Sequence, residues 1–151
     1  MKAADLNLRG AAKAGALALE AACPGVVFTS GRRGVADQAR AMASNLVKNR
    51  RWIAETYRDT VESRQLQAWV NAHPNVRGRE DLAKGLARIM ADWSDEARGR
   101  LSKHFSGDAF DIQPVDGPAG FAILAEVRKL AGLEKFLERE GGLVRWHAQF
   151  R

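Results

Sequence analysis

The C-terminal segment limits the fold of this chain more than any other part of the sequence. Gly141 and Gly142 separate two strand-like runs, 136–140 and 143–150. A two-residue Gly-Gly turn favours an antiparallel hairpin because both glycines accept positive φ angles. The other strand-like runs lie far away in the sequence, at 26–29 and 109–115. We therefore expect a small antiparallel sheet that is assembled from distant segments.

Helical patterns occupy most of the remaining chain. Pro24-Gly25 ends the first helical pattern, and Asp116-Gly117-Pro118 begins the last. His73-Pro74-Asn75 is the expected loop between the patterns at 61–70 and 82–93. Apolar residues recur at helical spacing in segments 3–22, 35–47, 61–70, 82–93 and 118–132. The predicted fold class is α+β, with a small antiparallel sheet and surrounding helices.

Length and composition narrow the class of protein. With 151 residues and no internal repeat, the sequence predicts a single domain, 1–151. The net charge of +6 favours anionic partners such as nucleic acid, lipid headgroups or an acidic cell envelope. Cys23 is the single cysteine, so an internal disulfide is excluded. Lys13 and Glu20 interrupt the alanine-rich start, which predicts synthesis in the cytoplasm without a signal peptide, and no run is long enough for a transmembrane segment.

One short segment carries residues that suit a metal ion. His104 and Asp111 flank Gly107, which can turn the chain so that a loop histidine meets a strand aspartate. Imidazole and carboxylate are ligand types that Zn²⁺ accepts. The third ligand is expected to be His147, on a strand-like segment, rather than His73, in a loop. Three such ligands leave a fourth position open for water, which is typical of catalytic zinc.

These residues resemble a known family, the zinc-dependent peptidoglycan peptidases. That family includes D-alanyl-D-alanine carboxypeptidases and phage L-alanyl-D-glutamate endolysins. Its pattern Ser-x-His-x-x-Gly-x-Ala-x-Asp matches the segment 102–111 at every specified position, and its Trp-His dipeptide matches Trp146-His147. Its Ser-Gly-Tyr-Arg motif followed by Gln matches Ser30, Gly31, Arg33 and Gln38, with Arg32 in place of Tyr.

The resemblance implies a fold, a cofactor and a set of roles. It implies a Hedgehog/DD-peptidase-like fold with Zn²⁺ held by His104, Asp111 and His147, and a helical insertion at about 48–100. Arg33 would stabilise the developing oxyanion or the substrate carboxylate. The motif positions imply that the peptidoglycan stem peptide is bound by Ser30, Gln38, Ser102 and Trp146, with Gln38 holding either the substrate or Arg33 by a hydrogen bond.

The general base departs from the family pattern. A carboxylate commonly lies three residues before the final histidine, and that position is Val144. A Gly-Gly hairpin would pair Glu140 with Leu143 and Glu138 with Arg145, which places both glutamates on the face of His147. We therefore expect Glu138, or else Glu140, to supply the base. The competing hypothesis is a protein that keeps the metal and has lost peptidase activity.

The function expected from this resemblance is hydrolysis of a stem-peptide amide bond next to a D-amino acid. A phage-type endolysin, monomeric and acting on the cell wall after release, fits the small size and the positive charge, which would attract an anionic cell envelope. A carboxypeptidase is the nearest alternative. A non-catalytic envelope-binding or virion protein is another. The basic segment 48–52, with Trp52 among cations, also allows a nucleic-acid-binding domain, which we do not favour because no recognition motif accompanies it.

Overall fold

The structure of this chain is a computed structural model that describes all 151 residues. It contains two compact units, and each is described here by itself. The sheet unit comprises Met1–Arg32 and Ser106–Arg151, and the helical unit comprises Arg33–Phe105. The helical unit is therefore longer than the expected insertion at about 48–100.

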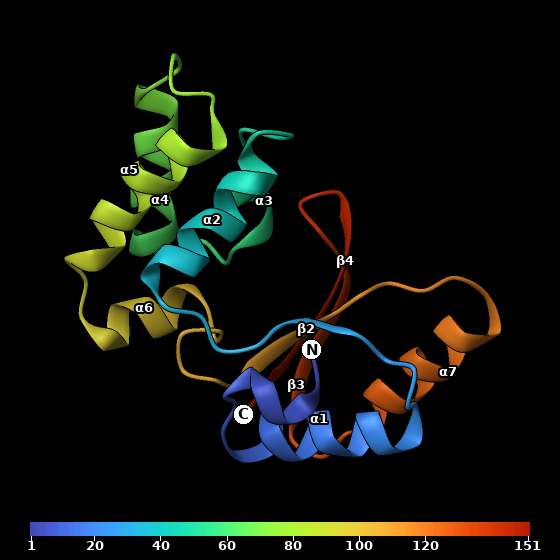
Figure 1. Cartoon of the computed structure of the whole chain (residues 1–151). Coiled ribbons are helices and arrows are strands. Elements are labelled where there is room, and N and C mark those ends of the chain that lie inside the picture. Colours follow the sequence, from blue (N-terminus) through green and yellow to red (C-terminus); the bar gives the residue numbers. More distant parts are fainter. The chain divides into compact units, whose positions relative to one another are not determined.

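The sheet unit contains a four-stranded open sheet, which confirms the α+β class. The strands lie in the order β1-β2-β4-β3, and every neighbouring pair is antiparallel. Figure 1 labels three of them, β2, β3 and β4. The four strands are β1 (Phe28–Ser30), β2 (Ala109–Ile112), β3 (Leu133–Glu140) and β4 (Leu143–Phe150). The sheet thus joins three distant parts of the chain, as the strand-like runs predicted.

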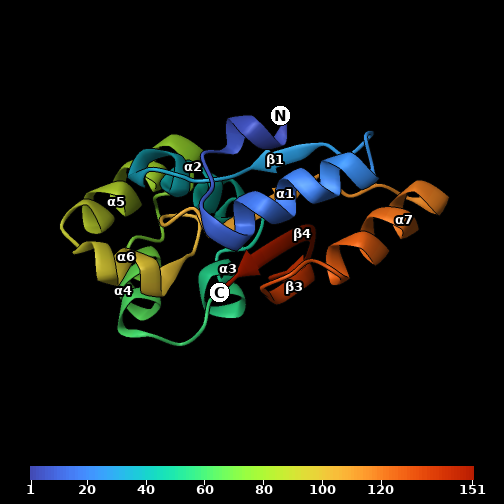
Figure 2. The same ribbon diagram turned by 90° about the horizontal axis from the view of Figure 1, so that it is seen from below.

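Three helical elements accompany this sheet, namely η1 (Ala3–Leu6), α1 (Gly10–Ala22) and α7 (Gly117–Arg128). Helices α1 and α7 are in contact and pack on the sheet through one hydrophobic core (Figure 2). Phe110 lies at its centre, with its ring centroid 5.4 Å from those of both Phe28 and Phe150. The expected continuous helix 3–22 is wrong, because Asn7 adopts a left-handed φ of 52° and divides it.

The C-terminal hairpin turns at the two glycines, with φ of 55° at Gly141 and 79° at Gly142. Glu140 pairs with Leu143, as predicted. The register then shifts, because Arg139 pairs with Val144 whereas Leu137 pairs with His147. One residue on β3, Glu138, therefore lies opposite two residues on β4. This β-bulge overturns the predicted pairing of Glu138 with Arg145.

The helical unit is built from five helices, two of which begin at side-chain caps. Thr60 accepts a hydrogen bond from the Ser63 N–H, and Ser94 accepts one from the Ala97 N–H. The helices are α2 (Val35–Leu46), α3 (Trp52–Thr56), α4 (Val61–Ala72), α5 (Arg79–Ala91) and α6 (Asp95–Leu101). The sequence patterns predicted α2, α4 and α5 but not the short α3 and α6. No helix in the structure has the length and apolar character that crossing a membrane requires.

Candidate metal centre

Strands β2 and β4 place two candidate ligands directly opposite each other. Asp111 pairs with His147 in the strand register. Their neighbours along the strands, Phe110 and Ala148, belong to the core that α1 and α7 cover. Because successive side chains alternate between the faces of a sheet, Asp111 and His147 point to the face away from that core.

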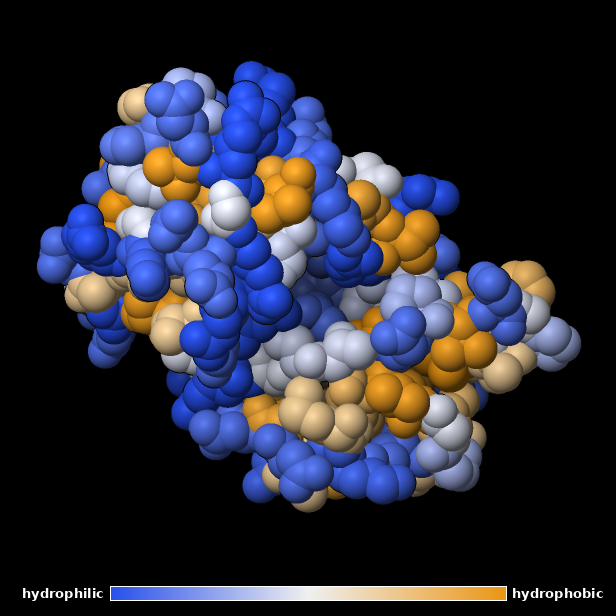
Figure 3. Space-filling view, turned by 45° about the horizontal axis from the view of Figure 1, so that its top comes forward, coloured by the Kyte–Doolittle hydropathy of each residue, from blue (hydrophilic) through white to orange (hydrophobic).

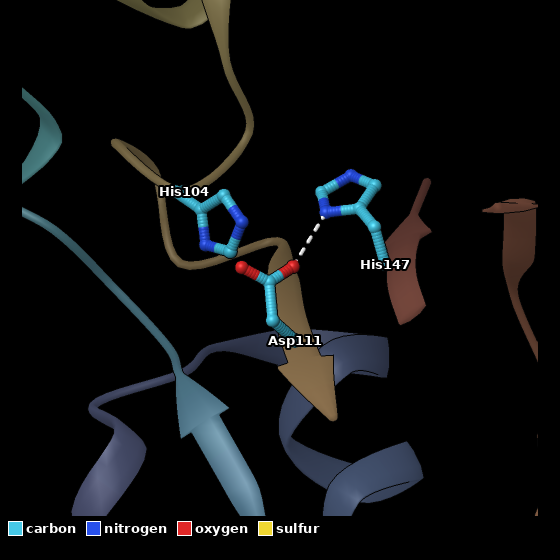
Figure 4. A group of neighbouring side chains, drawn as sticks. All are labelled: His104, Asp111 and His147. Atoms are coloured by element: carbon cyan, nitrogen blue, oxygen red, sulfur yellow. Dashed lines mark hydrogen bonds and ion pairs between the residues drawn. The ribbon is translucent and has the colours of Figure 1, made fainter. Parts of the chain in front are cut away.

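His104 completes a group of three side chains. His104, Asp111 and His147 each offer one ligand atom, and these atoms all lie within 4.8 Å of one another (Figure 4). His104 is 3% exposed and His147 is 7% exposed. Two imidazoles and one carboxylate form a donor set that fits Zn²⁺ and leaves a coordination position for water or substrate. This buried group can hold a metal ion.

The backbone of His104 is held on both sides. Its N–H donates to the Ser102 Oγ atom at 3.2 Å, and its carbonyl accepts the Arg33 N–H at 2.9 Å. Ser102, expected to bind substrate, is buried and contributes in this structure to the local geometry of His104. The two N–H···O bonds fix the peptide units on either side of the ligand.

The loop after His104 is held by two arginines whose role the sequence did not reveal. Arg32 donates from Nη2 to the Ser106 carbonyl at 2.8 Å. Arg9 donates its N–H to the Gly107 carbonyl at 3.1 Å, and its guanidinium binds Asp108 at 2.7 and 3.0 Å. Gly107 has a φ of 83°, and a Cβ atom there would lie 2.7 Å from the Arg32 guanidinium. The positive φ favours glycine here, and any larger side chain would have to displace the Arg32 guanidinium.

His147 is hydrogen-bonded at both ring nitrogens. Its Nδ1 atom lies 2.8 Å from Asp111 Oδ1, and its Nε2 atom lies 3.2 Å from Gln149 Oε1. Burial lowers the pKa of His147, but the hydrogen bond to Asp111, the charges of Asp111 and Glu140, and the bond to Gln149 together raise it above the ordinary histidine value.

Arg33 and Gln38 interact within the helical unit. Arg33 donates from Nη1 to Gln38 Oε1 at 3.2 Å, and Gln38 donates from Nε2 to the Tyr57 hydroxyl at 2.9 Å. Gln38 is fully buried, so its amide orientation is set by these partners. No spacing in the sequence indicates the part played by Tyr57.

Two predicted site residues lie elsewhere than expected. Glu138 accepts a hydrogen bond from Arg128 on α7 at 2.7 Å, and the same arginine lies over the Phe136 ring. Phe136 packs against the core, so Glu138 shares the α7 side of the sheet and not the face of His147. Trp146 is also buried in that core, where its ring approaches Gly120 of α7. The β-bulge explains the position of Glu138, and the alternation of side chains along β4 explains why Trp146 faces the core while His147 faces away from it.

Ser30, which the resemblance implies to bind substrate, is the last residue of β1. It pairs with Asp111 in the sheet register. Its side chain is 7% exposed, and its Oγ atom has no hydrogen-bond partner. A buried hydroxyl without a protein partner costs about 1–3 kcal/mol, so this atom is suited to hydrogen bonding with a bound ligand.

Two residues of the basic segment 48–52, Arg50 and Trp52, bind and pack within the helical unit, whereas Lys48 and Arg51 are exposed. Trp52 is 4% exposed and contacts Tyr57 edge-on, with ring centroids 5.4 Å apart. The Arg50 guanidinium donates to the carbonyls of Val70, His73 and Val76 at 2.8–3.1 Å. Neither Trp52 nor Arg50 is therefore placed for stacking on bases or binding phosphates.

Comparison with known proteins gives no match, since no family model, no curated protein and no solved structure is significantly similar to this chain.

Proposed function

We propose that this protein is a zinc-dependent peptidoglycan peptidase that hydrolyses a stem-peptide amide bond next to a D-amino acid. The observation that carries the proposal is the convergence of His104 and Asp111, from one motif, with His147, from another, to within 4.8 Å. The same motifs favour a Hedgehog/DD-peptidase-like fold. A phage-type endolysin, made in the cytoplasm and acting on the wall after release, is the form that we propose.

The chain offers groups for the steps of amide hydrolysis. Zn²⁺, when bound, would polarise a carbonyl group and lower the pKa of a bound water to about 7. Arg33 would supply a fixed cation for substrate oxygen, because its guanidinium donates to Gln38 Oε1 and its backbone N–H donates to the carbonyl of the ligand His104. Ser30 offers a buried hydroxyl for a substrate hydrogen bond, since its Oγ atom has no protein partner.

Glu140 replaces Glu138 as the proposed general base. Glu138 is engaged with Arg128 on the other side of the sheet. Glu140 is the second candidate from the hairpin, where it pairs with Leu143, and its charge is one of the causes that raise the pKa of His147. A carboxylate at this end of the hairpin could take the proton from the attacking water.

The positive charge supports an anionic envelope as the partner. The helical unit holds fourteen lysine and arginine residues against nine aspartate and glutamate residues, whereas the sheet unit holds ten against nine. Hydrophilic side chains cover most of the face of the helical unit that Figure 3 shows. Three exposed cations on or beside α5 form no ion pair, namely Arg77, Lys84 and Arg88. We propose that this unit attracts anionic polymers of the cell wall.

Zinc content and wall hydrolysis test the enzymatic proposal together. We expect about one zinc per chain and a fall in the turbidity of a cell-wall suspension, both abolished by His147→Ala. The matched control is His73→Ala, because His73 lies outside the group, where its ring stacks on Trp69. Zinc binding without hydrolysis would favour the non-catalytic envelope protein. A wild-type protein that binds no zinc would refute the peptidase.

Two triple variants with the same net charge test whether the helical unit binds the anionic partner. Arg77→Glu/Lys84→Glu/Arg88→Glu alters the helical unit, and Lys13→Glu/Lys135→Glu/Arg151→Glu alters exposed cations of the sheet unit. We expect only the first triple to release the protein from purified walls that carry anionic polymer. Equal losses in both variants would show that net charge alone attracts the protein. DNA binding lost only in the first triple, with wall binding intact, would instead favour nucleic acid.

A further inference from the structure

Gln149 and Glu134 are connected to His147 by hydrogen bonds and are not part of the ligand group. Gln149 follows His147 by two residues on β4, so both side chains are on the same face of the sheet. Gln149 Oε1 lies 3.2 Å from His147 Nε2. On the neighbouring strand, Glu134 accepts a hydrogen bond from Gln149 Nε2 at 3.4 Å.

The chemistry of Glu134 fixes the direction of this chain of hydrogen bonds. An ionised carboxylate only accepts, so the amide nitrogen of Gln149 must face Glu134. The amide oxygen then faces His147, and it too only accepts. The Nε2 atom of His147 must therefore carry the proton of this hydrogen bond.

We infer that Gln149, oriented by Glu134, is a positioning residue that makes Nδ1 the metal-binding nitrogen of His147. With Nε2 protonated, a metal would bind at Nδ1, and its binding would release the proton that Nδ1 donates to Asp111 Oδ1 at 2.8 Å. A partner on the second ring nitrogen commonly sets the tautomer and orientation of a ligating histidine. This inference rests on the proposed zinc centre, but not on peptidase activity.

The first test removes the acceptor. Gln149→Leu keeps a side chain of similar size and is expected to weaken the binding of zinc about 10–100-fold, as measured by competition with a chelating dye. In the zinc-loaded wild type, ¹⁵N NMR is expected to show His147 protonated at Nε2 and metal-bound at Nδ1. The variant is expected to lose the slow exchange of that Nε2 proton. Gln113→Leu, at an exposed glutamine, is the control.

The second test exchanges the two partners. Glu134→Gln/Gln149→Glu keeps the net charge and still presents an acceptor to His147, so zinc affinity is expected to stay within about threefold of the wild type. Gln149→Glu alone would place two carboxylates side by side, so the exchange is the cleaner rescue. A rescue by exchange distinguishes positioning from a general loss of folding.

Each outcome bears on the inference separately from the function. Unchanged zinc affinity in Gln149→Leu, or coordination through Nε2 in the NMR spectrum, would overturn the role of Gln149 and leave the peptidase intact. Zinc binding that depends on Gln149 in a protein without wall hydrolysis would leave the inference intact and overturn the peptidase. A wild-type chain that takes no zinc would overturn both.

Discussion

Glu138 on β3 accepts a hydrogen bond from Arg128 on α7 at 2.7 Å, on the side of the sheet opposite His147. This ion pair is about half exposed, so its effect on stability is expected to be small. Because this pair holds Glu138 away from the face of His147, we prefer Glu140 as the candidate for the general base.

Exchange of each hairpin glutamate for glutamine separates the two candidates. We expect Glu140→Gln to lower kcat for wall hydrolysis about 100-fold or more, because general bases contribute on this scale. Glu138→Gln is expected to keep kcat within about twofold. The measurement is the initial rate of release of free amines from purified walls, with zinc content measured for each variant. Equal rates for Glu140→Gln and the wild type would exclude Glu140 as the base.

Substitution of Gly107 tests whether its contact with Arg32 is important. Gly107→Ala is expected to lower the free energy of unfolding by at least about 1 kcal/mol more than Gly117→Ala. Both glycines have positive φ, 83° and 75°, but a Cβ atom at Gly117 would meet no atom within 4 Å. Gly117→Ala therefore measures the cost of placing alanine at a positive φ, about 1–2 kcal/mol, without a steric contact.

Urea unfolding measures this difference, and a double variant identifies its source. When Gly107→Ala is combined with Arg32→Ala, the additional loss beyond the Arg32→Ala protein should approach that of Gly117→Ala. Equal losses of stability in Gly107→Ala and Gly117→Ala, each in the otherwise wild-type protein, would show that the Arg32 guanidinium moves aside at little cost. Arg32 would then not require glycine at position 107.

Arg50 is expected to be a structural residue of the helical unit. Arg50→Met should lower the free energy of unfolding by about 2–3 kcal/mol, because three carbonyls around the end of α4 lose a charged donor. The neighbouring Arg51 is the matched control, because it is exposed and its one ion pair, with Glu55, is long at 3.9 Å. Arg51→Met should change the free energy of unfolding by about 0.5 kcal/mol or less. Thermal and urea unfolding measure both. Similar losses in the two variants would contradict the assignment.

Glu62 makes the stability of the helical unit depend on pH. The hydrogen bond from Arg100, at 2.7–2.8 Å, holds the pKa of Glu62 below its ordinary value of 4.5. A carboxyl group with a lowered pKa stabilises the folded state above its unfolded pKa, and this contribution is lost as the pH falls through the folded pKa. Glu62→Gln should therefore lower Tm at pH 7, and the difference from the wild type should shrink below about pH 4.5.

A control and a contrary result complete this prediction. Glu96→Gln removes an exposed carboxylate on α6 that forms no ion pair, and should leave Tm within about 1 °C at every pH. A Tm difference for Glu62→Gln that stays constant from pH 7 to pH 3 would show that the loss comes from packing and not from the charge of Glu62.

Local sequence determined most of the elements and the identity of the candidate ligands. The glycine pair at 141–142 sets the hairpin turn because only these positions combine positive φ with flanking strand-like runs, and apolar spacing set α2, α4, α5 and α7. The motif around Gly107 indicated His104 and Asp111, because the glycine conformation and the ligand types are properties of adjacent residues. The break at Asn7 was not predicted, since a left-handed asparagine leaves little trace in an apolar pattern.

Only the tertiary structure decided which side chains share a face of the sheet. One extra residue in β4 moves Glu138 to the side of Arg128, and no local pattern reveals a bulge that forms between two paired strands. The partners of His147 come from three strands, Asp111 on β2, Gln149 on β4 and, through Gln149, Glu134 on β3. The sequence contains these residues, but their hydrogen bonds depend on strand register, which is set by pairing between distant segments.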